Sequence, residues 1–298
     1  MSRLIKVASV QHACTDQVSE NLDTTEKLIE NAADEGADLV LLSELHTRLY
    51  IGQDNHPSYF DWAEPIPGPT SDLLQQWSDT YNLVIVGSVF EHRGNGVYHN
   101  SCVVADDDGS IAGIYRKMHI PDDPGFAEKY YFTPGDADGF EPISTSVGRL
   151  GVLICWDQWF PEAARLMALA GADILLYPTA IGWSVSDDDA ERGRQLEAWM
   201  TVQRGHAIAN HLPLVVANRC GYEENPLDSE DGIEFWGNSF ICGPQGEMLA
   251  RASSDESHMI CTEIYLNRTA ILRRSWPFFR DRRIDAYTDL CRRVRDVD

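Results

Sequence analysis

One cysteine lies in the most crowded stretch of the chain, "GVLICWDQWFPEAARLMALAGADILLYPT", which begins at Gly151. The apolar run 150–154 predicts a buried strand, and residues 161–170 predict a helix that starts at a proline and ends before Gly171. Cys155 therefore lies where a strand gives way to a turn before a helix, a position that suits a rigidly held nucleophile. Alternatively, Cys155 is a small apolar core residue, as most free cysteines are. This stretch alone leaves both interpretations open.

Three charged residues could assist such a nucleophile, which needs a base, oxyanion donors and an acid for the leaving group. Glu44 ends the run "ADLVLLSE", Lys117 follows the predicted strand "SIAGIY", and Glu128 lies in "AEKYYFTPGD". A carboxylate at the end of a buried strand is costly unless it is paired, and burial raises its pKa toward that of a useful base. A lysine beside an apolar strand provides a compact positive charge that arginine cannot.

Each of these charged residues also has an ordinary structural explanation. Glu44 could form a salt bridge with Arg48 at the rim of a sheet. Lys117 could be a surface residue, and Glu128 could be a solvated loop carboxylate. The residues themselves do not decide between these alternatives and catalysis.

The histidines and cysteines show no metal-binding pattern. His206 and His211 are five residues apart, which is poor spacing for one helix face, and His12 with Cys14 gives no ligand set. The seven cysteines include no C-x-x-C pair, which argues against zinc ribbons and disulfide frameworks. We therefore expect no metal and no other cofactor, in a reduced, cytoplasmic protein.

Strands and helices alternate along both halves of the chain, which predicts β-layers covered by helices and, from the similar halves, two sheets packed face to face. The first half predicts strands at 5–11, 38–43 and 83–89, helices at 21–35 and 71–81, and a hairpin of 101–105 with 110–115 around "DDDG". After the stretch around Cys155, the second half predicts strands at 174–177 and 214–217, a helix at 191–210, and a hairpin of 239–242 with 247–251. No linker divides the chain, so we expect one domain over residues 1–298.

Charge and hydropathy exclude several classes of protein. The net charge of −23 opposes binding to nucleic acid, which requires basic patches. No run of eighteen apolar residues occurs, so we expect no membrane span. An acidic chain with only four lysines among 298 residues stays soluble where salt screens charge, which predicts a halophilic protein. The alternative is an ordinary acidic protein with solvated loops.

Glu44, "YRKMHIP" around Lys117 and "LICWDQWFPEAAR" around Cys155 together resemble the nitrilase superfamily of carbon–nitrogen hydrolases. The resemblance runs over nearly the whole chain. Within the superfamily, "KMHIPDDPGFAEKYYFTPGD" and "GHAIANHLPLVVANRCG" are similar to the enzymes that hydrolyse N-carbamoylputrescine in polyamine biosynthesis. The resemblance implies an α-β-β-α sandwich with a core over residues 4–265. We also expect a homo-oligomer, a dimer or larger. The tail 266–298 is rich in arginine and aromatic residues and has no counterpart in the first half, so we expect it to pack on a neighbouring subunit.

By position, the resemblance implies that Cys155 is the nucleophile, Glu44 the general base, Lys117 an oxyanion donor and Glu128 a residue that positions the substrate and the lysine. The Trp156 N–H would be the second oxyanion donor. One departure is Ser43, where the family usually has proline, and another is the segment after Trp183, which puts the substrate rim in doubt.

The implied substrate is a small cationic ureido compound, for which we expect contacts from Tyr50, Trp156, Trp183, Asp187 and Asp188. The acids Asp122, Asp123 and Asp189 would also suit its cationic tail. Carbamoyl amino acids and ω-amides remain alternative substrates, although the residues just after Cys155 include no arginine to bind a carboxylate. An inactive scaffold with the same fold is the non-enzymatic alternative.

Overall fold

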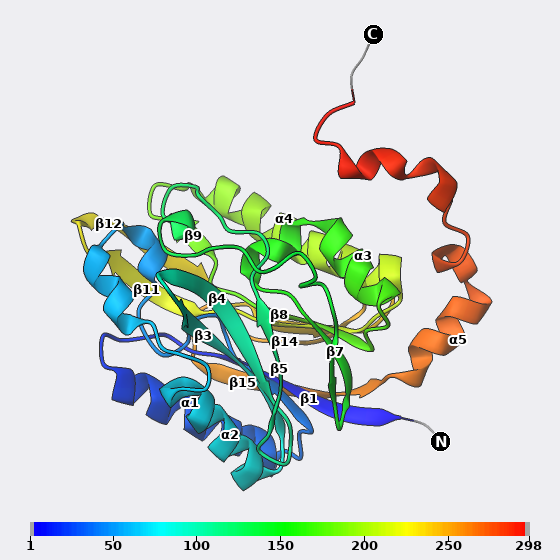
Figure 1. The fold of residues 1–298 in the computed structure, drawn as a ribbon, viewed down its shortest axis with the longest axis horizontal. Coiled ribbons are helices and arrows are strands. Elements are labelled where there is room, and N and C mark those ends of the chain that lie inside the picture. Colours follow the sequence, from blue (N-terminus) through cyan, green and yellow to red (C-terminus); the bar gives the residue numbers. More distant parts are fainter. Residues whose placement is uncertain (1–2, 296–298) are drawn as a thin grey trace.

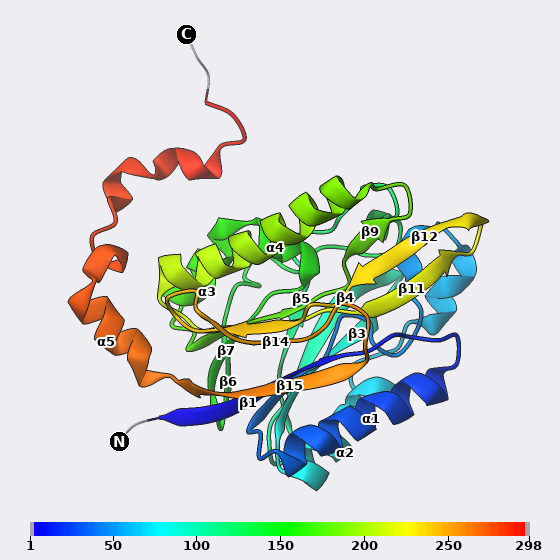
Figure 2. The same cartoon turned by 180° about the vertical axis from the view of Figure 1, so that it is seen from behind.

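The molecule has four layers in the order helices, sheet, sheet, helices (Figures 1 and 2). The structure is a computed structural model that describes residues 3–295 and, for residues 228–230, the backbone alone. Its α-helices are α1 (Val18–Asp34), α2 (Pro69–Tyr81), α3 (Pro161–Leu169), α4 (Asp189–Asn210) and α5 (Asn267–Ser275). Helices α1 and α2 cover one outer face, and α3 and α4 cover the other.

The first sheet has six strands in the order β15-β1-β2-β3-β4-β5. Strands β1, β2 and β3 are parallel to one another, and β15, β4 and β5 add antiparallel partners at the two sides. The bounds are β1 Leu4–Gln11, β2 Leu39–Leu41, β3 Val84–Gly94, β4 Val97–Ala105, β5 Ile111–Arg116 and β15 His258–Tyr265. The turn between β4 and β5 contains Gly109 at a φ of +77°, as the predicted "DDDG" hairpin requires.

The second sheet repeats this plan in the order β14-β13-β10-β8-β7-β6. Its central strands β7, β8 and β10 are parallel, and antiparallel strands flank them. The bounds are β6 Ile143–Thr145, β7 Gly148–Val152, β8 Ile174–Pro178, β10 Leu214–Ala217, β13 Phe240–Cys242 and β14 Met248–Arg251. The predicted fold of two similar sheets covered by helices is therefore confirmed.

The core explains why the two sheets stack. In β2, Leu39 and Leu41 belong to the cluster between the sheets, whereas Val40 packs with α1 and α2 in a separate cluster. This alternation follows from the period of two along a strand. All five residues of β8 are buried, because a central parallel strand is covered on both faces. The Ser9 hydroxyl also donates to the Val216 carbonyl oxygen at 2.7 Å and so joins the two sheets.

Several features of the structure, β6 and α5 among them, lie beyond the elements predicted from the sequence. Strands β9 (Gly182–Ser184), β11 (Cys220–Asn225) and β12 (Asp228–Trp236) form a third, three-stranded sheet. Strand β15 follows β14 of the second sheet in the chain but belongs to the first sheet. It pairs with β1 over its whole length, from Leu4 opposite Tyr265 to Gln11 opposite His258. The chain therefore closes the sandwich by returning to the first sheet.

The segment after β15 extends away from the sandwich, beginning with α5 and continuing as short helical turns (Figure 1). Its large apolar side chains are mostly exposed, namely Ile271, Trp276, Ile284, Leu290 and Val294. The last residues of the predicted tail, 296–298, lie outside the described part. Within residues 3–295, no helix is both long and apolar enough to cross a membrane.

Candidate active site

Cys155 lies at a sharp bend between β7 and α3. It is the first residue of a short 3-10 helix, Cys155–Trp159, that follows the end of β7. Its φ is +42°, which costs energy in a residue other than glycine and is typical of nucleophiles presented on a tight turn. The side chain is almost fully buried, and Sγ lies 3.9 Å from the Ala180 carbonyl oxygen. The bend therefore holds the Cys155 thiol in a fixed orientation.

Asp157 holds this bend in shape. Its Oδ2 accepts hydrogen bonds from the Ile154 backbone N–H at 2.9 Å and the Tyr115 hydroxyl at 2.7 Å. Its Oδ1 accepts from the His119 backbone N–H at 3.0 Å and lies 2.6 Å from His119 Nδ1. Because His119 follows Lys117 by two residues, this one carboxylate ties the cysteine bend to the segment that carries the lysine.

Lys117 is fully buried between two carboxylates. Its Nζ donates to Glu44 Oε1 at 2.8 Å and to Glu128 Oε2 at 2.7 Å. Burial alone would lower the pKa of the ammonium, but the charges of Glu128 and Glu44 raise it above its ordinary value. Lys117 is therefore a fixed positive charge in a dry site, where a charge acts more strongly on a developing oxyanion than it does in water. The surface alternative for Lys117 is wrong.

The two oxygens of Glu44 are in different situations. Oε1 accepts from Lys117 and from Asn100 Nδ2, the latter at 2.6 Å. Oε2 is buried and has no hydrogen-bond partner among the described residues. A buried acceptor without a partner is costly, so Oε2 is the oxygen of Glu44 that is free to accept a hydrogen bond from a bound molecule. The ion pair of Glu44 is with Lys117 rather than with Arg48.

Glu128 lies behind the lysine and is also completely buried, so the alternative of a solvated loop carboxylate is wrong. Its Oε1 accepts from the Tyr50 hydroxyl at 2.7 Å, and its Oε2 lies 3.5 Å from Asn100 Nδ2. Burial raises the pKa of the Glu128 carboxyl above its ordinary value, although Lys117 opposes the shift. Sequence reasoning missed Asn100, which donates to both carboxylates. An asparagine directly before the predicted strand 101–105 is the signal that could have found it.

Burial also raises the pKa of the Cys155 thiol well above its ordinary value, and the negative charge of Glu44 adds to the shift. The thiol is therefore protonated in the resting protein. A nucleophile in that state requires a base at the moment of attack rather than a thiolate formed beforehand.

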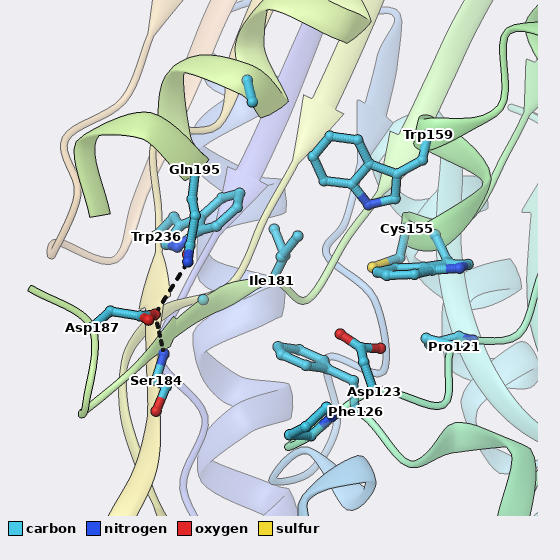
Figure 3. A pocket seen from close by; sticks show the side chains of 14 residues that line it. Pro121, Asp123, Phe126, Cys155, Trp159, Ile181, Ser184, Asp187, Gln195 and Trp236 are labelled. Atoms are coloured by element: carbon cyan, nitrogen blue, oxygen red, sulfur yellow. Dashed lines mark hydrogen bonds between the residues drawn. The ribbon is translucent and has the colours of Figure 1, made fainter. Parts of the chain in front are cut away.

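A cavity of about 420 Å³ opens onto Cys155 (Figure 3). Most of its wall is apolar or aromatic, including Phe126, Trp156, Trp159, Ile181 and Trp236. Its charged lining residues are Asp123 and Asp187, and no lysine or arginine is among the described residues that line it. Such a wall suits an alkyl chain that ends in a positive charge.

The residues predicted to contact substrate are placed differently from one another. Trp156 and Asp187 line the cavity. Tyr50 is buried, its ring centroid is 5.6 Å from that of the lining residue Phe126, and its hydroxyl donates to Glu128. Trp183 stands in the chain between the lining residues Gly182 and Ser184, and its indole N–H donates to the Arg192 carbonyl oxygen at 3.1 Å.

Asp188 requires a correction. Its side chain caps the N-terminus of α4 by accepting from the Glu191 N–H at 2.8 Å, and the residue is not part of the cavity wall. The physical reason is that the first N–H groups of a helix have no partner inside the helix and are satisfied by a side chain such as aspartate.

No group of three or more His, Cys, Asp or Glu side chains within residues 3–295 is arranged to hold a metal ion. The arrangement at the cavity is instead a buried thiol and a Glu–Lys–Glu cluster. A thiol beside a carboxylate and a fixed positive charge is an arrangement that could attack a carbonyl carbon and stabilise the oxyanion that forms.

Comparison with known proteins identifies the class of enzyme. The model of the carbon–nitrogen hydrolase family matches residues 6–274. An N-carbamoylputrescine amidase of Solanum lycopersicum is 44% identical over 290 residues, covering 96% of this chain and 94% of its own. A citrullinase of Francisella tularensis is 42% identical over 292 residues, covering 97% and 99%. The crystal structure of a carbon–nitrogen hydrolase from Helicobacter pylori G27 superposes with a TM-score of 0.95 at 50% identity, covering 98% of this chain and all of the other.

The chain belongs to the carbon–nitrogen hydrolase family, which is the nitrilase superfamily that its sequence resembles. It is an enzyme that acts on amides, and the inactive scaffold is thereby set aside.

Proposed function

We propose that the enzyme hydrolyses N-carbamoylputrescine to putrescine, carbon dioxide and ammonia. The observation that carries this proposal is the cavity at Cys155. Among the described residues that line it, the charged ones are two carboxylates, with no lysine or arginine beside them. An ammonium at the end of an alkyl chain suits that wall, and a carboxylate does not. The 44% identity to plant N-carbamoylputrescine amidases over 96% of the chain supports the same substrate.

In the proposed acylation step, Cys155 Sγ attacks the ureido carbon while Glu44 takes the thiol proton. The tetrahedral oxyanion is stabilised by the Lys117 ammonium and by the Trp156 backbone N–H. Glu44 then returns the proton to the departing nitrogen, so the carbon–nitrogen bond breaks and ammonia leaves. The product is a carbamoyl group that still carries putrescine on its nitrogen and is bound through its carbonyl carbon to Cys155 as a thioester-like intermediate.

In the proposed deacylation step, water takes the place of ammonia. Glu44 removes one proton from the water as its oxygen attacks the carbonyl carbon, and the same oxyanion donors act again. The carbon–sulfur bond breaks, and Cys155 recovers its proton from Glu44. The carbamic acid that is released then decarboxylates to putrescine and carbon dioxide. One water is consumed for each ammonia, and no redox partner is required.

The test is a comparison of ammonia release from four substrates. We expect kcat/KM for N-carbamoylputrescine to exceed the values for citrulline, N-carbamoyl-β-alanine and a simple ω-amide by about 100-fold or more, because each of these competitors carries a carboxylate that the cavity does not neutralise. Citrulline is included because of the citrullinase relative. A higher kcat/KM for any of the three acids would contradict the proposal.

We further propose that the protein is a cytoplasmic homo-oligomer in which the tail after residue 265 packs on a neighbouring subunit. The exposed apolar side chains of that tail support this proposal, since soluble monomers rarely leave so many together in water.

We also propose that the enzyme is adapted to high salt. With a net charge of −23, the folded state repels itself at low ionic strength, and salt shortens the range of that repulsion. We expect Tm to rise by about 5 °C or more between about 0.1 M and about 2 M sodium chloride. Chloride is chosen because sulfate stabilises most proteins by exclusion from their surface. A flat or falling Tm would refute salt adaptation.

A further inference from the structure

The two carboxylates that line the cavity have different surroundings. Asp187 Oδ2 accepts hydrogen bonds from the Ser184 N–H at 3.1 Å and from Gln195 Nε2 at 3.3 Å (Figure 3). These bonds shape the loop between β9 and α4, so the Asp187 charge already has a structural use.

Within the described part of the chain, the Asp123 carboxylate lacks comparable hydrogen bonds at its Oδ1. This atom is buried and has no hydrogen-bond partner among the described residues, although the residue as a whole is only half-buried. In Figure 3 the carboxylate points into the cavity, on the side opposite the Trp159 ring. A buried carboxylate oxygen without a donor is costly, and the cost is removed when a cation binds to it.

The surroundings of Asp123 agree with a cation receptor. Burial raises the pKa of the Asp123 carboxyl above its ordinary value, and an ammonium in the cavity would oppose this rise. Aromatic walls supplied by Phe126, Trp156 and Trp236 lie around the same cavity. Such rings cover a methylene chain and also attract an ammonium through their faces.

The Asp123 loop is firmly connected to the catalytic cluster. The Phe126 N–H donates to the Asp123 carbonyl oxygen at 2.9 Å and closes a tight turn, in which Gly125 has a φ of +80°. The Ala127 N–H is bonded to the Gly52 carbonyl oxygen at 2.8 Å, and Glu128 is the next residue. A ligand held by Asp123 is therefore fixed relative to the Glu–Lys–Glu cluster.

We propose that Asp123 is the specificity-determining residue of the enzyme and binds the distal ammonium of the substrate. This inference rests on the function proposed above and deepens it, because it assigns the cation to Asp123 rather than to Asp187 or Asp188. According to this assignment, the substrates are ureido compounds with a primary ammonium at the far end of an unbranched chain.

The experiment compares N-carbamoylputrescine with N-pentylurea, in which a methyl group replaces the ammonium. In the wild type we expect a higher kcat/KM for N-carbamoylputrescine. Asp123→Asn keeps the shape of the side chain and removes its charge. We expect it to lower kcat/KM for N-carbamoylputrescine on the order of 100-fold, mainly through KM, while the value for N-pentylurea changes by less than about threefold. Asp123→Ser provides a second variant should the amide fail to fold.

Asp122→Asn is the matched control. Asp122 is the adjacent acid, is exposed, lies outside the cavity wall, and pairs loosely with Lys129 at 3.9 Å. We expect its kinetics with both substrates to stay within about threefold of the wild type, because a surface ion pair contributes little. Asp187→Asn is measured beside it.

The outcomes separate the two proposals. A wild type that hydrolyses N-carbamoylputrescine, with equal losses on both substrates or no loss in Asp123→Asn, overturns the Asp123 assignment alone. A selective loss in Asp187→Asn but not in Asp123→Asn also overturns it. A wild type without activity on N-carbamoylputrescine overturns the proposed function and this assignment together.

Discussion

Replacing Cys155 by alanine is expected to lower kcat by roughly 10⁵-fold while the protein remains folded. The covalent route disappears with the sulfur, and Ser43 and Thr179, although buried near the strand ends, are not among the cavity-lining residues. The fold should persist because alanine meets the same backbone strain at a φ of +42° that cysteine already tolerates. Ammonia release measures the activity, and thermal unfolding measures the fold.

Cys242→Ala is the matched control for this variant. Cys242 lies in β13, is fully buried and belongs to the core cluster between the layers, away from the cavity wall. Its truncation should lower the free energy of unfolding by about 1 kcal/mol through lost packing and leave kcat within about twofold. If Cys155→Ala keeps kcat within about tenfold of the wild type, Cys155 is not the nucleophile.

The sequence located the strand ends well because those positions combine two strong local signals. Glu44 and Cys155 each follow an apolar run that is buried in the structure, in β2 and β7, and a charged or reactive residue at such an end is conspicuous. Lys117 directly follows β5, a strand that is only partly buried. Hydrophobic periodicity could not predict that these side chains contact one another. Glu44 and Lys117, for example, are 73 residues apart in the chain and meet only through tertiary structure.

Other parts of the molecule depend on contacts that leave little trace in local sequence. Asn100 lies within a strand that we predicted only from residue 101 onward, so its side chain was not considered. Strand β15 alternates weakly and owes its pairing with β1 to the return of the chain after the second sheet. Strands β11 and β12 are rich in acidic residues and resemble loops by composition, and their pairing with β9 is tertiary.

The sequence also could not assign different roles to the neighbouring acidic side chains near the cavity. The segment 187–189 contains three adjacent aspartates, and their sequence is equally consistent with substrate contact and with helix capping. The structure separates them, because Asp188 caps α4 whereas Asp187 orders the loop and also lines the cavity. Which acid is free to bind a cation depends on hydrogen bonds formed after folding.

Glu44→Gln is expected to lower kcat by about 10³-fold or more with N-carbamoylputrescine. The substitution keeps Oε1 available as an acceptor for Lys117 and Asn100, which hold it at 2.8 Å and 2.6 Å, so the cluster should assemble. It replaces Oε2, the buried oxygen without a partner, by an NH₂ group that cannot accept a proton. Because the Cys155 thiol is protonated at rest, both the attack and the departure of ammonia lose their proton carrier.

A substrate with a better leaving group distinguishes proton transfer from a simple loss of structure. An activated ester such as 4-nitrophenyl acetate releases an anion that needs no proton, so the general-acid part of the Glu44 role is not required. We expect the loss in the acylation rate of Glu44→Gln to be at least about tenfold smaller with this ester than with N-carbamoylputrescine. Equal losses on the two substrates, with Tm unchanged, would mean that protonation of the departing ammonia is not the step that Glu44→Gln impairs. A kcat within about tenfold of the wild type on N-carbamoylputrescine would remove Glu44 from proton transfer altogether.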